Sequence, residues 1–261
     1  MDTISALGIK PYLVSPEVAE NIKVYAAIDS TNREAKDRAV NNAVHGTVII
    51  SDRQTHGKGR LNRSFFSPAG SGLYMSFILY SQCLRFENPT AITAFAAVCV
   101  CDAIEIVCNL KPSIKWVNDI FLNGKKVGGI LTEAIPDREE PGANKFILGI
   151  GINVCTVQND FPEAIRQHTR SLYPDGYTLM TRNELAAEII NRILLSGIPS
   201  EAELYERYRN RLFMLGSNVT VIQGNEQYEA IALDINSNGC LLVKTVNGNI
   251  KTLSSGEVRI C

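Results

Sequence analysis

The chain has 261 residues, of which 45% are apolar and 20% are charged, and its formal net charge is −1. These values are typical of one large globular domain, or of one domain with a small appendage. A net charge near zero favours binding neither to nucleic acid nor to an anionic membrane surface. A ligand with phosphates would therefore need a local cluster of basic residues.

The N-terminal stretch lacks the basic start, the apolar run and the small-residue cleavage site of a signal peptide. The longest apolar run, over residues 94–107, is interrupted by Asp102 and Glu105, so it predicts a core helix rather than a membrane span. The seven cysteines contain no CxxC pair, and the three histidines are scattered. An odd, unpatterned set of cysteines favours reduced thiols over a disulfide framework or a zinc site. We therefore expect a cytoplasmic protein with no membrane partner.

Helices and strands are mixed through most of the chain. After an irregular start, residues 31–34 (TNRE) have the form of a capping box with Thr31 as the cap, which predicts a helix to about residue 42. Asn123 and Gly124 predict a type I′ hairpin turn. The other expected elements are strands at 47–51, 72–80, 126–133 and 146–154, and helices at 89–110, 181–195 and 201–213.

The pattern changes near residue 215. Beyond it the chain shows only short strands, separated by turn residues at 223–225, 236–239 and 246–249. This pattern predicts a small SH3-like β-barrel. Mixed strands and helices followed by a β-only tail indicate an α+β fold, with a main domain over residues 1–214 and a C-terminal domain over 215–261.

A polar loop between the strands at 47–51 and 72–80 carries the local basic cluster. Glycines let a backbone approach a ligand closely and expose N–H donors, while basic side chains bind anions. A solvated surface loop with incidental charge would explain the same residues, and the loop does not match the Walker A pattern. The loop holds Arg53, Lys58, Arg60 and Arg63, with Gly57 and Gly59 between the cations.

Three further features place polar or aromatic groups beside predicted strands. Phe65 and Phe66 stand at the base of the loop, where they could fold it over a flat ligand or anchor it in the core. Lys115 lies in an otherwise apolar strand, and its burial is costly unless it meets an anion. A lysine that snorkels at a sheet edge is the alternative. Asn153 ends a buried strand, either as a ligand contact or as an ordinary strand end.

Together and in this order, these segments resemble one family, the biotin protein ligases. The resemblance spans about residues 25–155, and several ordered motifs are harder to match by chance than any one of them. It implies a class II synthetase-like catalytic domain, whose mixed β-sheet is backed by helices. The matching segments are residues 29–32 (DSTN), Gln54, 57–60 (GKGR), 66–68 (FSP), 115–119 (KWVND), 128–131 (GGIL) and 149–153 (GIGIN).

The resemblance implies a role for each matching residue. Lys115 and Arg60 would be catalytic, with Lys115 holding the biotin carboxylate in line with the α-phosphate of ATP. Asn153 would contact the nucleotide or its metal, and the other metal ligands stay unknown. The implied biotin-binding residues are Ser30, Thr31, Gln54, Gly57, Lys58, Arg60, Lys115, Gly128 and Gly129. The implied nucleotide-binding residues are Lys58, Arg60, Arg63, Phe65, Asn118 and Asn153.

The implied activity has two steps and uses ATP, Mg²⁺ and biotin. Biotin and ATP give biotinyl-5′-AMP, and a lysine of a biotin carboxyl carrier protein then takes the biotin. Bifunctional members of the family also carry an N-terminal DNA-binding domain, but only about 28 residues precede Asp29 here. We therefore expect a ligase without repressor function and without a nucleic-acid partner, and we leave a homodimer open.

Four residues depart from the family pattern. Lys58 stands where arginine is usual, so a point charge replaces a planar fork. Asn62 stands where glycine is common, Phe65 where tryptophan is common, and Val117 where proline is usual. These changes concern loop geometry and affinity, and they leave Lys115 and Arg60 in place.

Three other functions compete with this interpretation. Lipoate or octanoate attachment uses a related fold, but the R-R-x-S-G-G-G run of that family does not occur in this sequence. A non-catalytic regulator that binds biotin or a nucleotide would use Lys115 and the basic loop for binding alone. A nucleic-acid-binding module built on the C-terminal barrel has little support, because the tail offers few basic residues and one aromatic, Tyr228.

Overall fold

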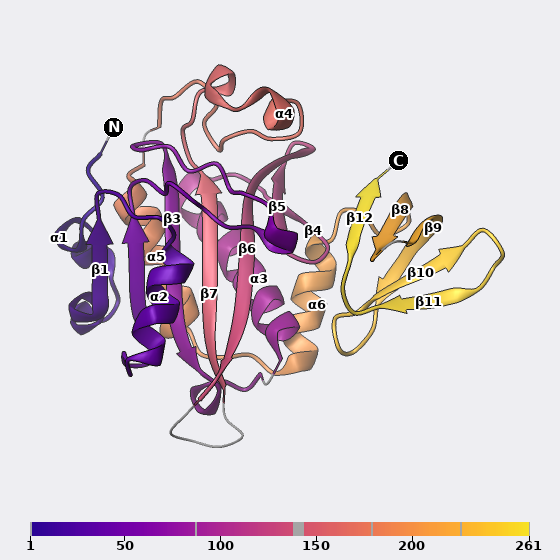
Figure 1. Cartoon of the computed structure of the whole chain (residues 1–261), viewed down its shortest axis with the longest axis horizontal. Helices are drawn as coiled ribbons and strands as arrows, with labels where there is room; N and C mark the ends of the chain where they lie inside the picture. The colour runs from indigo at the N-terminus through magenta and orange to yellow at the C-terminus, as the bar shows by residue number, and fades with distance from the viewer. Residues whose placement is uncertain (1, 87, 138–143, 179, 225, 261) are drawn as a thin grey trace.

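The computed structural model describes residues 2–86, 88–137, 144–178, 180–224 and 226–260, and it contains two β-sheets (Figure 1). The larger sheet is mixed and has helices on both faces, while the smaller sheet is antiparallel and lies at the C-terminal end. The α+β prediction is therefore confirmed. The six cysteines of the described ranges are free thiols. The predicted turn residue Asn225 and the predicted free thiol of Cys261 lie outside the described residues.

The main sheet has seven strands in the order β1-β2-β3-β7-β6-β5-β4. β1 runs parallel to β2, and every other neighbouring pair is antiparallel. Asn123 and Gly124, with φ of 50° and 74°, form the predicted hairpin turn between β5 and β6. The strands are β1 (Ile22–Tyr25), β2 (Thr47–Ser51), β3 (Gly72–Tyr80), β4 (Ser113–Lys115), β5 (Asp119–Leu122), β6 (Lys125–Pro136) and β7 (Asn144–Asn153).

The start of the chain is regular, so the expectation of an irregular start is wrong. It folds into short helices and then adds β1 to the edge of the sheet, beside β2. A strand of four residues is too short to show a periodic pattern, and its partner lies more than 20 residues along the chain. The short helices are α1 (Ala6–Ile9), η1 (Lys10–Tyr12) and η2 (Pro16–Asn21).

The helix α2 (Thr31–Val40) begins as predicted, but its cap is different. The N-cap residue is Ser30, which has an extended backbone and makes no side-chain capping bond. The Thr31 hydroxyl is bonded to other side chains, and Glu34 accepts hydrogen bonds from Tyr25 and Arg38. The predicted capping box is therefore wrong, because tertiary partners take both of its side chains.

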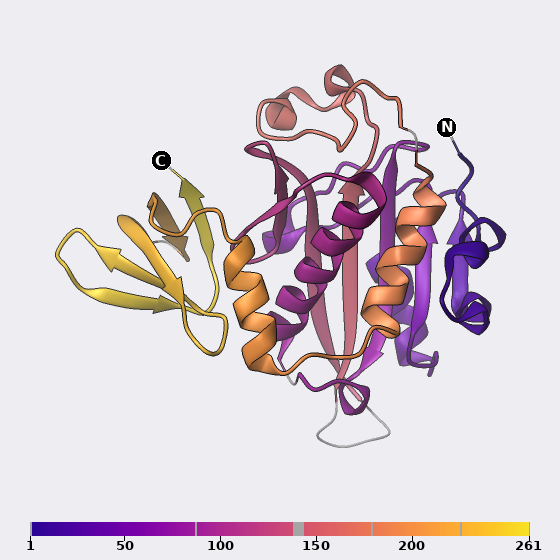
Figure 2. The same cartoon turned by 180° about the vertical axis from the view of Figure 1, so that it is seen from behind.

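Helices cover the two faces of the main sheet unequally (Figure 2). On one face, Ala35 and Ala39 of α2 pack against Ile49, Ile78 and Ile147. The opposite face is covered by α3 (Pro89–Cys108), α5 (Arg182–Leu194) and α6 (Glu201–Arg211). The remaining short elements are η3 (Arg60–Asn62), η4 (Ser81–Cys83), η5 (Gln158–Asp160) and α4 (Glu163–Arg166).

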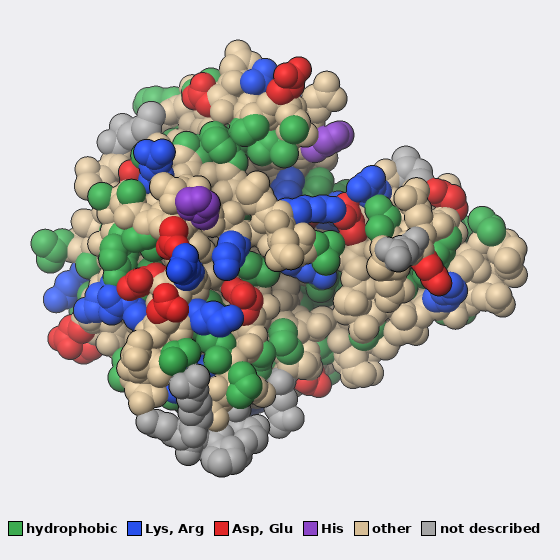
Figure 3. Space-filling model, in the orientation of Figure 1, with side chains coloured by type: hydrophobic (Ala, Val, Ile, Leu, Met, Phe, Trp, Pro, Cys, Tyr) green, Lys and Arg blue, Asp and Glu red, His purple; other side chains and the backbone are tan. Residues whose placement is uncertain are grey.

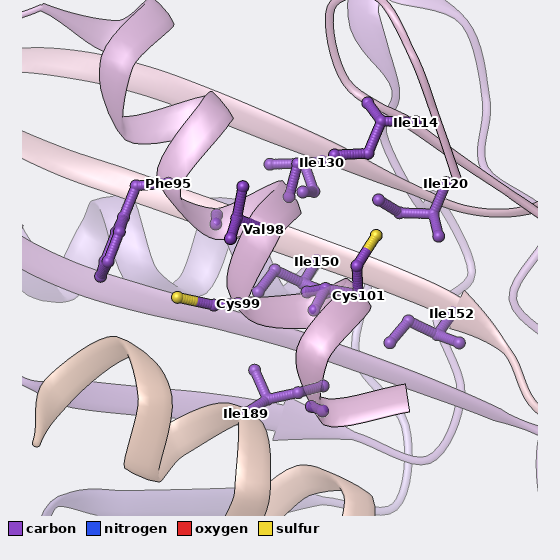
Figure 4. Close-up of a cluster of buried hydrophobic side chains, with 14 of the residues drawn as sticks. Phe95, Val98, Cys99, Cys101, Ile114, Ile120, Ile130, Ile150, Ile152 and Ile189 are labelled. Atoms are coloured by element: carbon purple, nitrogen blue, oxygen red, sulfur yellow. The ribbon is translucent and has the colours of Figure 1, made fainter. Parts of the chain in front are cut away.

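The helix α3 is long and apolar enough to cross a membrane, but most of it is buried inside the fold. It packs on the sheet between α5 and α6, which lie on either side of it in the same layer, and its burial confirms the predicted core helix. Figure 4 shows Val98 and Cys101 of α3 beside Ile130 and Ile150 of the strands. Asn109, whose φ of 52° is left-handed, ends the helix slightly before the predicted end.

The C-terminal sheet has five antiparallel strands in the order β11-β10-β9-β8-β12. It contacts the main domain through the Trp116 indole, which donates to the Gly239 carbonyl at 3.0 Å, and through an ion pair of Arg209 with Asp234. The domain division at residue 215 stays a prediction. The strands are β8 (Asn218–Gln223), β9 (Glu226–Ile235), β10 (Leu241–Thr245), β11 (Ile250–Leu253) and β12 (Glu257–Ile260).

Candidate functional site

One row of paired residues crosses the main sheet from β4 to β3. Lys115 pairs with Asp119, Asp119 with Gly129, Gly129 with Gly151, and Gly151 with Tyr74. Residues paired across neighbouring strands present their side chains on the same face of the sheet. The register thus places Lys115 in one row with Gly129 and Gly151, which belong to two other predicted motifs.

This row lies on the face that α2 covers. A Cβ built on Gly149, two residues before Gly151 on the same strand, would lie 2.0 Å from the Asn32 side-chain oxygen of α2. A Cβ built on Gly151 would lie 2.7 Å from the Phe65 ring, which the loop between β2 and β3 carries. The glycines therefore give α2 and the loop room to approach the strand backbone.

The two predicted glycines of β6 point to opposite faces. Gly129 belongs to the row, whereas Gly128 pairs with Ile120 and Ile152, which lie in the core under α3. A Cβ on Gly128 would lie 2.7 Å from the Gly151 carbonyl oxygen, so packing within the sheet requires a glycine there. Successive strand residues alternate between faces, so Gly128 lies on the core side of β6, and its predicted backbone contact with biotin stays a prediction.

At one end of the site, Thr31 and Gln54 bond to each other. The Gln54 side-chain oxygen accepts from the Thr31 amide at 2.8 Å and from the Thr31 hydroxyl at 3.1 Å. The Gln54 amide nitrogen donates to the Ser67 hydroxyl at 2.9 Å, and Ser76 of β3 donates to the Thr31 hydroxyl at 2.8 Å. A polar network thus joins α2, the loop and the sheet, and the predicted contacts of Thr31 and Gln54 with biotin stay a prediction.

Ser30 and Gly57 border this network. Ser30 is buried, and its amide donates to the side chain of Asp29. Gly57 is also buried, and a Cβ there would lie 2.5 Å from the Phe65 carbonyl oxygen and 2.7 Å from the Ser67 hydroxyl. Only glycine lets the loop fold this closely on itself, so the loop geometry around Gln54 depends on Gly57.

Lys115 lies at the end of β4, at the other end of the row. Its side chain is half-buried, with the ammonium nitrogen 5.5 Å from the centre of the Phe121 ring. Burial lowers the pKa of Lys115, and the charge of Asp119 opposes this effect. Asp119 itself bonds Lys126 at 2.6 Å, and Lys115 has no ion pair within the described part of the chain. The Lys115 cation is therefore available to an anionic ligand.

Arg60 joins the loop to the same end of the sheet. Its guanidinium donates to the Asn118 side-chain oxygen at 3.0 Å, and the Asn118 amide donates to the Ile130 carbonyl at 2.8 Å. Burial lowers the pKa of Arg60, and nearby Asp119 opposes this shift. Arg60, Asn118 and Lys115 are thus gathered at one place, as predicted.

Three other predicted residues differ in the contacts that they make. Arg63 forms an ion pair with Glu257 of β12, and Lys58 is exposed, with no ion pair among the residues described. Asn153 is buried, and its amide donates to the Arg170 carbonyl at 3.3 Å. Figure 3 shows Lys and Arg side chains, mixed with acidic ones, where the main domain meets the C-terminal sheet.

Phe65 takes part in the site through packing. Its ring lies edge-on to Tyr74, with ring centres 6.3 Å apart, and covers Gly151. Neighbouring Phe66 instead packs against Phe161, in the segment that follows β7. Both aromatics therefore anchor the loop in this structure.

Two residues outside the predicted set, Ser76 and Glu257, contact the predicted ones. Ser76 bonds both Thr31 and Asn32. The sequence pointed to it only as a lone serine in the otherwise apolar strand β3. Glu257 bonds Arg63, but nothing in the sequence connects residues 194 positions apart. Burial opposes ionisation of Glu257, yet the hydrogen bonds from Arg63 and Arg259 outweigh it and lower its pKa.

Two cavities lie away from this row. One of about 500 Å³ is bordered by the N-terminal segment, Asp52 and Arg182, and one of about 450 Å³ lies between α6 and the C-terminal sheet. Within the described ranges, no group of three or more His, Cys, Asp or Glu side chains could hold a metal ion. The row, with its free lysine and its polar network, is the candidate site.

Two family models match the chain. Residues 24–153 match the biotin/lipoate A/B protein ligase family, and residues 214–260 match the biotin protein ligase C-terminal domain. The first match contains every predicted site residue. The second covers the five-stranded C-terminal sheet.

Curated and solved proteins are similar over nearly the whole chain. The bifunctional ligase/repressor BirA of Bacillus subtilis is 33% identical, over 98% of this chain and 79% of its own length. The biotin–[acetyl-CoA-carboxylase] ligase of Mycobacterium tuberculosis is 28% identical, over 91% of this chain and 88% of its own. The biotin protein ligase of Aquifex aeolicus in complex with biotin and ATP is 29% identical, with a TM-score of 0.76 over 93% of this chain and 100% of its own.

Proposed function

This chain belongs to the biotin protein ligase family, and we propose that it converts biotin and ATP to biotinyl-5′-AMP and transfers the biotin to a lysine of a biotin carboxyl carrier protein. The observation that carries this function is the row across the sheet. A neutral polar network lies at one end of the row, and a free lysine with Arg60 lies at the other. This arrangement suits a ligand with a neutral ring head and a carboxylate tail.

The first step forms the adenylate. The Thr31 and Gln54 groups bond the N–H and C=O of the ureido ring, exchanging their present partners for the ligand. A biotin carboxylate oxygen attacks the α-phosphorus of ATP, and the bond from that phosphorus to pyrophosphate breaks. Lys115 and Arg60 hold the carboxylate and the phosphate together and stabilise the charge of the transition state.

The second step transfers biotin. The neutral amine of the carrier lysine attacks the carbonyl carbon of the mixed anhydride, AMP leaves and the amine loses a proton. No enzyme nucleophile is needed, so the chain acts by positioning and electrostatics. The loop between β2 and β3 keeps water from the anhydride until the carrier arrives.

Mg²⁺ would enter with ATP. Mg²⁺ commonly binds substrate phosphates and water with few protein ligands, and this fits a site where the described side chains form no metal-binding cluster. When bound, the ion neutralises charge on the phosphates. Lys58, Arg63, Phe65, Asn118 and Asn153 stay predictions as nucleotide contacts.

Lipoate attachment is the second candidate, because the first family model covers both biotin and lipoate ligases. The C-terminal match to the biotin protein ligase domain favours biotin. A non-catalytic regulator would bind the same ligand without making an adenylate.

The test is incubation of the purified chain with ATP, labelled biotin and a biotin carboxyl carrier domain, with unlabelled lipoate as competitor. We expect biotin to become attached to the carrier only when ATP is present, and excess lipoate not to reduce the yield. Labelling that lipoate abolishes would support the second candidate. Binding of biotin without AMP formation would support the regulator.

The setting of the enzyme is proposed from the sequence alone. We propose a cytoplasmic enzyme, as the unpatterned cysteines favour, with no membrane or nucleic-acid partner, as the net charge of −1 favours. A homodimer stays a prediction, which sedimentation of the chain with and without biotin would test.

A further inference from the structure

The loop that carries Gln54, Arg60 and Phe65 leaves β2 and returns to β3, and its two ends are joined. Asp52 follows β2 directly, and both of its carboxylate oxygens lie 3.1 Å from the amide nitrogen of Gly70. Gly70 lies two residues before β3. Asp52 therefore closes the base of the loop, which spans residues 53–69.

A buried arginine, Arg182, bonds both ends of the loop. Arg182, the first residue of α5, is only 2% exposed. One of its terminal nitrogens donates to the Asp52 carboxylate at 2.6 Å and to the Gly72 carbonyl at 3.1 Å. A single guanidinium nitrogen thus contacts the residue after β2 and the first residue of β3.

The other nitrogens of the same guanidinium are held by the N-terminal segment. The Arg182 Nε donates to the Asp2 carboxylate at 2.9 Å, and the second terminal nitrogen donates to the Asp2 carbonyl at 2.7 Å. A buried arginine is costly unless ion pairs and hydrogen bonds satisfy it. Here Asp2 and Asp52 supply two carboxylates, so the guanidinium is fixed in position.

We propose that Arg182 is a positioning residue, which clamps both ends of the loop so that the loop holds the bound adenylate. The proposal rests on the proposed function. Arg182 bonds Asp2, Asp52 and Gly72, none of which is a proposed ligand contact, so it acts through the loop ends. A loop with fixed ends loses less conformational freedom when it closes over a ligand, which slows ligand release.

The variant Arg182→Lys tests the clamp. A lysine keeps the charge, but its single nitrogen cannot reproduce the planar fork that joins Asp2, Asp52 and Gly72. We expect trypsin to cut the ligand-free variant within residues 53–69 roughly tenfold faster than the wild-type chain. We also expect preformed biotinyl-5′-AMP to leave the variant roughly tenfold faster, with little change in the rate of its formation.

Arg211→Lys is the matched control. Arg211 of α6 bonds Asp102 and Glu105 on α3 and neither end of the loop, so its replacement also weakens a partly buried ion-pair cluster. The control should lower the free energy of unfolding and leave the two rates as in the wild type. Equal changes in both variants, or wild-type rates in Arg182→Lys, would overturn the clamp. If the wild-type chain makes no adenylate, the proposed function fails, and the tryptic rates still decide whether Arg182 clamps the loop.

Discussion

At the scale of single residues, the decisive group is the ammonium of Lys115. The end of β4 places it in line with Gly129 and Gly151, and burial lowers its pKa. The nearest acidic residue in the row, Asp119, is already bonded to Lys126. The site therefore holds a partly desolvated cation, which interacts strongly with a carboxylate or phosphate.

The lowered pKa of Lys115 predicts where activity is lost at high pH. The charged lysine is the active form, so kcat/KM for biotin is retained below its pKa and falls as the pH rises through it. This loss should occur below the ordinary lysine pKa of about 10.4. In Lys115→Arg, whose guanidinium stays charged, any remaining activity should persist to higher pH.

The measurement is the pH dependence of kcat/KM for adenylate formation, which reports the free enzyme. A pH profile that falls at the same alkaline pH in both proteins would assign the titration to another group.

At the scale of elements, the loop over residues 53–69 fits the sheet because glycines remove side chains at points of contact. Gly57 lies against the Phe65 carbonyl, and Gly151 lies beneath the Phe65 ring. Neither glycine has a left-handed φ, so steric room explains why glycine is needed at both positions.

Gly57→Ala and Gly59→Ala form a matched pair within this loop. The new Cβ at position 57 would lie 2.5 Å from a carbonyl oxygen, whereas at position 59 its closest neighbour is 3.4 Å away. Overpacking of this kind costs about 1–3 kcal/mol, so we expect Gly57→Ala to raise the Kd for biotin roughly tenfold. Gly59→Ala should change it by less than about twofold. Calorimetric titration measures both, and equal effects would exclude the steric explanation.

The sequence predicted the elements with strong local signals. The hairpin at Asn123 and Gly124 and the apolar helix α3 follow from turn chemistry and composition. The strand β1 was missed because its partner is distant in the chain. The cap at Thr31 failed because Gln54 and Ser76 compete for its hydroxyl, and such partners are visible only in the folded chain.

The same limit applies to the site. Motif order predicted that Lys115, Arg60 and Asn118 gather, and the structure brings them together. The order of the motifs could not show that Gly128 lies on the core side of β6, because the side of the sheet on which a strand residue lies depends on the register of the strands. It also could not pair Arg63 with Glu257, since that contact crosses from the loop to the C-terminal sheet.

At the scale of the whole molecule, α3 is the central support of the main sheet. Its buried residues pack on strands that carry the site row, while α5 and α6 flank it on the same face of the sheet. The helix α6 also contacts the C-terminal sheet, through Arg209 and Asp234. The strands that carry the site therefore pack on a hydrophobic core that continues into the C-terminal sheet.

Two isoleucines of α3 separate stability from activity. Ile104 is fully buried, and Ile104→Ala should lower the free energy of unfolding by about 2–5 kcal/mol. Ile106 is 63% exposed, and Ile106→Ala should change it by less than about 0.5 kcal/mol. Urea unfolding measures both values. Folded Ile104→Ala should keep the wild-type KM for biotin, and a large rise in KM would mean that the core also shapes the site.

The central claim is that Lys115 serves adenylate formation, and single-turnover formation of biotinyl-5′-AMP from biotin and ATP tests it most directly. We expect Lys115→Ala to fold as the wild type does and to lose roughly 10²–10³ in rate. The exposed neighbour Lys111 provides the control, and Lys111→Ala should keep the wild-type rate. Adenylate formation by Lys115→Ala at a rate close to that of the wild type would contradict the claim.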